Sequence, residues 1–127
     1  AGVAAGIGFN GIGITGVAPS ATLSAIRLIA APVTDTKISQ AMDFQNGSIQ
    51  VKSNSWGPEN PFFGPGTLTQ AALSAAVANG RGGYGTIFVW AAGNSGLAGD
   101  RADYDGYQTS PFTISVAAIG DDGTQSS

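Results

Sequence analysis

Short apolar runs that alternate with segments of helical periodicity are the feature that most constrains the fold of this chain. Strand-like runs lie at residues 21–29, 48–54, 87–92 and 112–119, and helical patterns lie at 35–45 and 67–80. Such alternation is typical of an α/β fold in which parallel strands are joined by right-handed helical crossovers. Ligands of parallel sheets bind in loops beyond the carboxyl ends of the strands, which here are loops 55–66 and 93–110.

Local signals set the ends of these segments. Residues 87–92, IFVWAA, form the most apolar run and are expected to be a central strand with no solvated face. Residues 21–29 are likewise expected to form a strand buried on both faces. Thr67 precedes an Ala-rich helical pattern that stops at Gly80, which predicts a helix packed tightly against the sheet. Residues 1–5 have the small side chains of a helix end.

Composition limits the function classes. Charged residues make up only 10% of the 127 residues, which suggests that much of the segment lies inside a larger protein. The net charge of -3 disfavours nucleic acid as a partner, and no apolar run reaches the roughly 20 residues of a membrane span. There is no Cys, so disulfides are excluded, and no His, so this chain alone cannot supply a Ser/His/Asp triad.

The glycine-rich loop 6–20 allows several interpretations. Residues 6–11 match GxGxxG, but a helix-like segment rather than a strand precedes them, so dinucleotide binding is a weak hypothesis. A nucleotide binder of flavodoxin-like fold rests on this motif and the fold class alone. Inward carbonyls together with Asn10 would suit a hard cation such as Ca²⁺. A glycine-rich turn without any ion is the simplest alternative, and composition by itself favours it.

Polar residues follow the apolar run at 87–92. Asn94 lies between glycines, where its amide could donate a hydrogen bond to a developing oxyanion, or where it could simply adopt a left-handed turn conformation. Asp100, Asp103 and Asp105 could bind a cation or a basic substrate, or could form a solvated loop. Trp56 is expected to be a packing aromatic, and Ser55 has no base in this chain that would make it a nucleophile.

Taken in order, these segments resemble the catalytic domain of subtilisin-like serine proteases, specifically the kexin and furin branch. The resemblance covers nearly the whole chain. Ala1-Gly2 is similar to the residues that follow the catalytic His motif of that family, and Asp105-Gly106-Tyr107 also matches. The longer matching segments are the calcium loop at 10–19, NGIGITGVAP, the substrate-binding strand at 53–58, SNSWGP, and the oxyanion strand at 80–96, GRGGYGTIFVWAAGNSG.

The resemblance implies a serine-type endopeptidase with a three-layer subtilisin-like α/β fold and a mainly parallel central sheet. Residues 1–127 would be a central part of that domain, with the catalytic Asp and His upstream and the nucleophilic Ser downstream. The segment alone would then be inactive. The family's habit implies a secreted or extracellular protein, peptide or protein substrates, and the remainder of the domain as a partner. The alternative is a degenerate relative that binds peptides and calcium without catalysis.

The resemblance also implies roles for individual residues. Asn94 would donate to the oxyanion, and Asp105 would lie at the base of the first specificity pocket to hold an Arg side chain. The residues expected to bind substrate along the two pocket walls are Ser55, Trp56, Gly57, Pro58, Ala91, Ala92 and Gly93. The residues expected to hold a first Ca²⁺ are Ile7, Ile12 and Ile14 through carbonyls and Asn10 through its side chain, while Asp100 would help to hold a second.

One residue departs from the furin-like pattern. Asn60 stands where that pattern has an Asp that lines the pocket and ligates the second calcium ion. The loss of one carboxylate weakens the electric field that selects a basic side chain.

Overall fold

The computed structural model of the chain describes residues 1–30, 32–58 and 62–125, with a parallel three-stranded sheet at its centre. The strands are β1 (Val51–Asn54), β2 (Ile87–Ala91) and β3 (Thr113–Val116), in the spatial order β1-β2-β3. The register pairs Asn54 with Trp90 and Ala91 with Val116. The expected α/β class and the central position of the 87–92 run are therefore confirmed.

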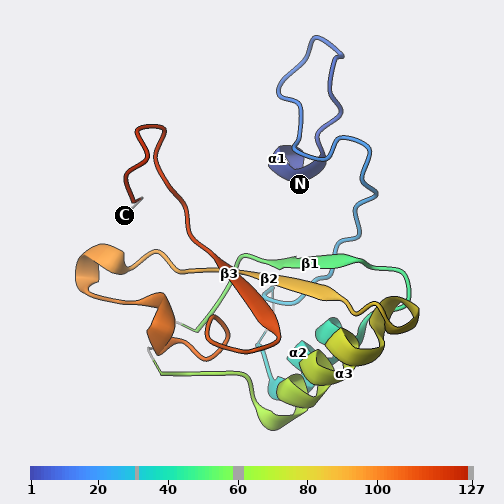
Figure 1. The fold of residues 1–127 in the computed structure, drawn as a ribbon, viewed down its shortest axis with the longest axis vertical. Coiled ribbons are helices and arrows are strands. Elements are labelled where there is room, and N and C mark those ends of the chain that lie inside the picture. Colours follow the sequence, from blue (N-terminus) through green and yellow to red (C-terminus); the bar gives the residue numbers. More distant parts are fainter. Residues whose placement is uncertain (31, 59–61, 126–127) are drawn as a thin grey trace.

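Two helices, α2 (Asp35–Asp43) and α3 (Thr67–Gly83), lie against the same face of the sheet (Figure 1). The carboxylate of Asp35 accepts hydrogen bonds from the main-chain N–H groups of Leu68 and Thr69, each at 3.0 Å, and so caps the start of α3. Regular helical geometry in α3 breaks at Gly80, the predicted stop, because Gly80 has a ψ of 154° and Arg81 follows with a φ of 54°.

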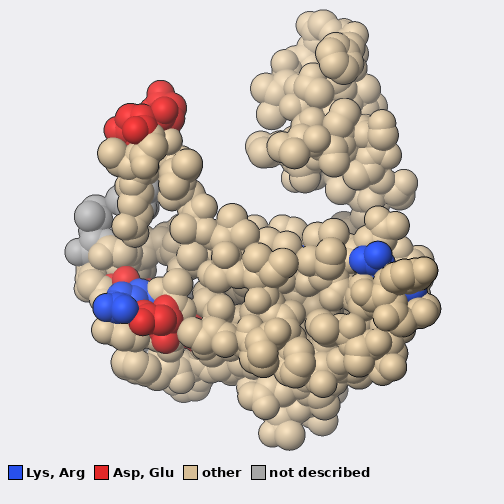
Figure 2. All heavy atoms as spheres, viewed as in Figure 1, with Lys and Arg blue, Asp and Glu red and all other residues tan. Residues whose placement is uncertain are grey.

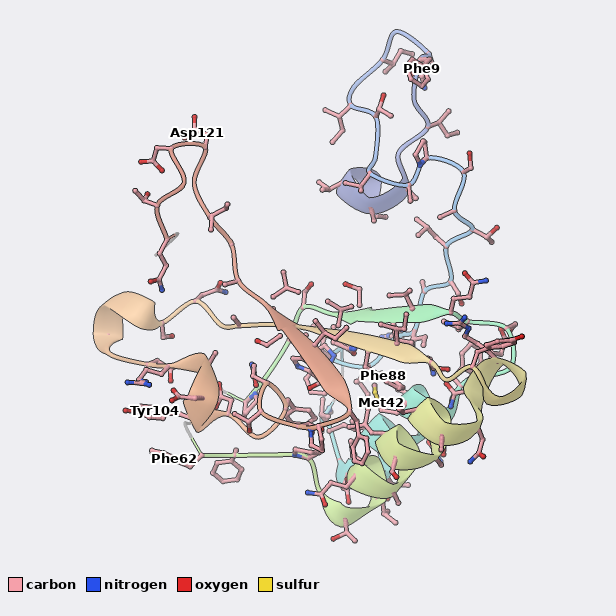
Figure 3. The ribbon with its side chains drawn as sticks, viewed as in Figure 1. Phe9, Met42, Phe62, Phe88, Tyr104 and Asp121 are labelled. Atoms are coloured by element: carbon pink, nitrogen blue, oxygen red, sulfur yellow. The ribbon has the colours of Figure 1, made fainter. Side chains whose placement is uncertain are left out.

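The core lies between the helices and the sheet, where Figure 3 shows Met42 and Phe88. Its members are the buried apolar residues of α2, α3 and β2 together with one tyrosine: Ile38, Ala41, Met42, Ala72, Leu73, Ala76, Phe88, Trp90 and Tyr107. Lys52 is also buried, and its ammonium donates to the carbonyls of Ala41 and Met42 at 3.2 and 2.6 Å. Burial lowers the pKa of Lys52 to about 8, while nearby Asp43 acts in the opposite direction.

The other face of the sheet is open, which corrects the expectation that residues 87–92 have no solvated face. Ile87 is 41% exposed, and Val51, Ile114 and Val116 are more exposed still. In this strand only alternate residues are buried, because both packed helices cover one face. The described residues thus form two of the three layers that the family resemblance implies. Two segments project from the sheet, the N-terminal glycine-rich loop and the chain after β3, and the surface between them carries no charged side chains in Figure 2.

Residues 21–29 do not form the expected strand. No ladder in the described residues includes them, and they are exposed except for Leu28, which packs on the core. A cavity of about 280 Å³, lined by Ser24, Ile26 and residues of β1, separates this segment from the edge of the sheet. A strand needs main-chain hydrogen bonds from a neighbour, and this apolar run has no neighbour within bonding distance.

Two arms extend from this body (Figure 1). The first holds α1 (Gly2–Ala5), as predicted, and the glycine-rich loop that follows it. The second is the chain after β3, where Gly123 N–H donates to Gly120 O at 3.0 Å in a turn. Among the described residues, none of the helices has the length and apolar character needed to cross a bilayer.

Candidate functional site

The loops that follow β1 and β2 start side by side, because the parallel register pairs the last residue of β1 with Trp90. The first loop begins at Ser55 and the second at Ala92. The second loop contains two short 3-10 helices, η1 (Gly96–Ala98) and η2 (Ala102–Tyr104). This edge of the sheet is where parallel α/β folds place their ligands.

An aromatic cluster anchors the first loop. The indole N–H of Trp90, which is fully buried, donates to the carbonyl of Trp56 at 2.6 Å. The Trp56 ring meets the Trp90 ring edge to face, with centroids 4.8 Å apart, and Trp90 stacks on Tyr107 at 4.7 Å. Asn54 accepts the indole N–H of Trp56 at 3.2 Å. Trp56 is therefore a packing aromatic, as expected, and its carbonyl is already occupied.

Main-chain groups on either side of Trp56 remain accessible. Ser55 and Gly57 are exposed, and neither forms a main-chain hydrogen bond with another described residue. Pro58 follows as the last described residue before the gap, and Asn60 lies outside the described residues. Free N–H and C=O groups in such a segment can pair with an extended peptide as an added strand.

Asn94 is exposed, and its side chain makes no hydrogen bond to another described residue. The left-handed backbone conformation belongs to Gly93, which has a φ of 102°, and not to Asn94. The alternative in which Asn94 itself adopts a left-handed turn is therefore wrong. Asn94 lines a hollow of about 430 Å³ together with Ala92, Gly93 and Asp100.

Asp105 does not line that hollow and is only 6% exposed. Its Oδ1 atom accepts no hydrogen bond from the described residues. Burial raises the pKa of Asp105 above its usual value, and the negative charge of Asp100 adds to the effect. Among the described residues, the Oδ1 atom therefore has no hydrogen-bond donor and no ion-pair partner beside it.

Gln108 joins the candidate site, although the sequence pattern did not single it out. Its side-chain Nε2 donates to the carbonyl of Ala91 at 3.0 Å, at the end of β2. A Cβ built on Gly57 would lie 3.7 Å from the same nitrogen, so the amide lies between the two segments expected to be pocket walls. Nothing in the sequence of a polar loop predicts that a glutamine lies between these segments. The only indication is that Gln108 follows Asp105 by three residues.

The other two acidic residues of this loop, Asp100 and Asp103, have different partners. Arg101 forms a bidentate ion pair with Asp103, with contacts of 2.7 and 2.8 Å, and both side chains are exposed. Asp100 accepts the main-chain N–H of Arg101 at 2.9 Å. In the part of the chain that the structure describes, no group of three or more acidic or other metal-ligating side chains comes together.

The glycine-rich loop projects away from this edge of the sheet (Figures 1 and 3). Main-chain bonds close its neck, with Gly16 N–H donating to Gly6 O and Val17 N–H to Val3 O, both at 3.0 Å. Asn10 Oδ1 accepts the N–H of Ile12 at 3.0 Å, so this expected ligand atom already bonds within the loop. The expected calcium set of Ile7, Asn10, Ile12 and Ile14 contains only neutral oxygens, whereas a Ca²⁺ site takes about 6–8 oxygens with carboxylates among them. These residues alone do not fit a complete calcium site.

The sequence matches the profile of the subtilase family over residues 1–127. It is 43% identical over 126 residues to a PC3-like endoprotease, variant B, of Hydra vulgaris, a match that covers 97% of this chain and 18% of that protein. It is 40% identical over 121 residues to human proprotein convertase subtilisin/kexin type 4, covering 93% of this chain and 16% of the relative. Furin-like protease 2 of Drosophila melanogaster is 39% identical over 121 residues, covering 93% of this chain and 7% of its own length. The chain thus spans less than a fifth of these relatives, and it belongs to the subtilase family.

Proposed function

We propose that the protein containing this chain is a serine endopeptidase of the kexin and furin type. The observation that carries the proposal is the Asn94 side chain, which is exposed and unbonded among the described residues at the carboxyl end of a parallel strand. An amide held there can donate to the negative oxygen that develops when a peptide carbonyl is attacked.

The substrate would bind in extended form along Ser55, Trp56, Gly57 and Pro58, with Ala91, Ala92 and Gly93 as the opposite wall. The free main-chain groups of Ser55 and Gly57 support this proposal. Trp56 would offer the substrate only its main-chain N–H, because its carbonyl accepts the indole N–H of Trp90. Its ring would hold the segment in place by packing. Asp105 would hold a basic side chain at the base of the first pocket.

The nucleophile and the general base would come from the remainder of the protease domain. The 127 residues contain no His, so the usual base has to be supplied by chain outside them. We therefore propose that residues 1–127 act as the central part of the domain, supplying the oxyanion donor and the pocket walls, and that the segment alone does not cleave peptides.

The test is peptide cleavage by the parent protein and by its Asn94→Ala variant. In subtilisin, a member of the same family, the loss of one oxyanion donor lowers turnover about 10²- to 10³-fold, and we expect a loss of that size here with little change in KM. Asn79→Ala, on the exposed surface of α3, is the matched control and should retain full activity. Equal turnover in both variants would show that Asn94 does not donate to the oxyanion. A folded parent that binds peptides but cleaves none would favour the non-catalytic binding module.

Calcium binding is proposed for the whole domain. Carbonyls of Ile7, Ile12 and Ile14 and the amide oxygen of Asn10 would contribute, while the carboxylates that Ca²⁺ prefers would come from outside these residues. Asp100 would contribute to a second site at the edge of the hollow that it shares with Asn94. We also propose that the protein acts in the secretory pathway or outside the cell, where calcium is abundant. Fractionation of cells that express the parent, with detection of the protein in the medium, tests this location.

A further inference from the structure

Gln108 occupies a position that links the two proposed walls of the substrate site. Its Nε2 bonds to Ala91 O at 3.0 Å on one wall and lies 3.7 Å from the Cβ position of Gly57 on the other. Because Gly57 has no side chain, the Gln108 amide can lie directly against its main chain.

The orientation of this amide is determined by its partner. Ala91 O is a pure acceptor, so the donor end of the Gln108 amide has to face it, and the acceptor atom Oε1 is directed elsewhere. The acceptor atom Oε1 is buried and accepts no hydrogen bond from the described residues. A buried acceptor without a donor lowers stability, and its retention in a folded protein calls for an explanation.

Asp105 carries a second acceptor of the same kind, Oδ1. One turn holds both residues, because the main-chain N–H and the hydroxyl of Thr109 each donate to Asp105 O at 3.0 Å. Arg101, four residues before Asp105, is engaged by Asp103 in the bidentate ion pair. The turn 105–109 therefore presents two buried acceptors that no donor of the described residues reaches.

We propose that Gln108 is a specificity-determining residue, and that its Oε1 accepts an N–H from the same substrate guanidinium that pairs with Asp105. This inference rests on the proposed endopeptidase function. A guanidinium carries five N–H donors in a planar fork and no acceptor, so it can serve two acceptors from different residues. A Lys ammonium carries three donors on a single nitrogen, so it cannot pair with the carboxylate through two nitrogens and also present a further N–H from the same plane to Gln108. Gln108 therefore favours Arg over Lys in the first pocket.

The test uses the parent protein and peptides that differ only in the residue before the scissile bond, which is Arg, Lys or Phe. Gln108→Met keeps the length of the side chain and removes the acceptor. We expect it to lower kcat/KM for the Arg peptide about 10- to 100-fold, through KM, with the Lys and Phe peptides changed less than about twofold. Gln70→Met is the matched control, since Gln70 is an exposed glutamine on α3 whose amide, among the described residues, bonds only to Pro65 O at 3.2 Å.

A second variant separates specificity from folding. Gln108→Glu keeps an acceptor on the pocket side, so its ratio of Arg to Phe cleavage should equal or exceed that of the unaltered protein, even if its stability falls. An unchanged Arg-to-Lys ratio in Gln108→Met, or an equal loss on all three peptides, would overturn the inference while leaving the endopeptidase proposal intact. A parent that prefers Phe would overturn the inference together with the proposed role of Asp105, while endopeptidase activity as such would stand. A parent that cleaves none of the peptides would instead refute the proposed function, and this inference with it.

Discussion

Replacement of Trp90 by Phe in the parent protein tests whether the aromatic cluster holds the proposed substrate-binding segment in place. Trp90 has no exposed surface, and its indole N–H bonds to Trp56 O at 2.6 Å. Phe retains one ring but leaves that carbonyl without a partner, at a cost of about 1–3 kcal/mol. The missing ring atoms leave a small cavity, and the stacking on Tyr107 weakens. We expect the free energy of unfolding to fall by about 2–4 kcal/mol in total.

The assay combines urea denaturation with peptide cleavage. Because the released carbonyl lies between Ser55 and Gly57, the loss of order should raise KM for peptides more than it lowers kcat. Trp56→Phe is the matched control: it removes a longer bond, 3.2 Å to Asn54 Oδ1, from a half-buried ring. We expect the control to lose only about 1 kcal/mol. If Trp90→Phe lost no more stability than Trp56→Phe, or left KM unchanged, the Trp90 hydrogen bond would not anchor this segment.

Two further predictions concern charge and metal. Because burial lowers the pKa of Lys52 to about 8 in the folded state, the unfolded state binds more protons above that pH, and the free energy of unfolding should rise by about 1–2 kcal/mol between pH 7.5 and 9.5. Urea titrations at these two pH values should show the rise, and Lys52→Met should abolish it; a fall with pH would contradict the assignment. Since the glycine-rich loop offers only neutral oxygens, calorimetry should detect Ca²⁺ binding to the parent protein but none at micromolar Ca²⁺ to residues 1–127 alone. Tight binding by the isolated segment would show that the loop needs no outside carboxylate.

Much of the architecture was predictable because its signals are local. The stop of α3 near Gly80 depends on residues next to the helix, and the apolar run at 87–92 identified the central strand. The start of α3 at Thr67 was also predicted, although its capping group comes from the distant Asp35. Asn94 could be singled out because it follows that strand directly. The prediction that residues 21–29 form a strand was wrong, since an apolar run becomes a strand only when a neighbour supplies hydrogen bonds. Asn60, whose replacement of an Asp was noted in the sequence, lies outside the described residues.

The sequence by itself determined the α/β class, the family and the order of the segments, because periodicity, turn residues and motif spacing are read along the chain. Only the tertiary structure showed that Asp35 caps a helix 33 residues further on, that the Lys52 ammonium is buried against the end of α2, and that the Gln108 amide lies between Ala91 and Gly57. Each of these contacts joins residues far apart in sequence. A polar side chain of this kind gives no local pattern, and its partner is decided only when the packing of helices on the sheet brings two distant segments within hydrogen-bond distance.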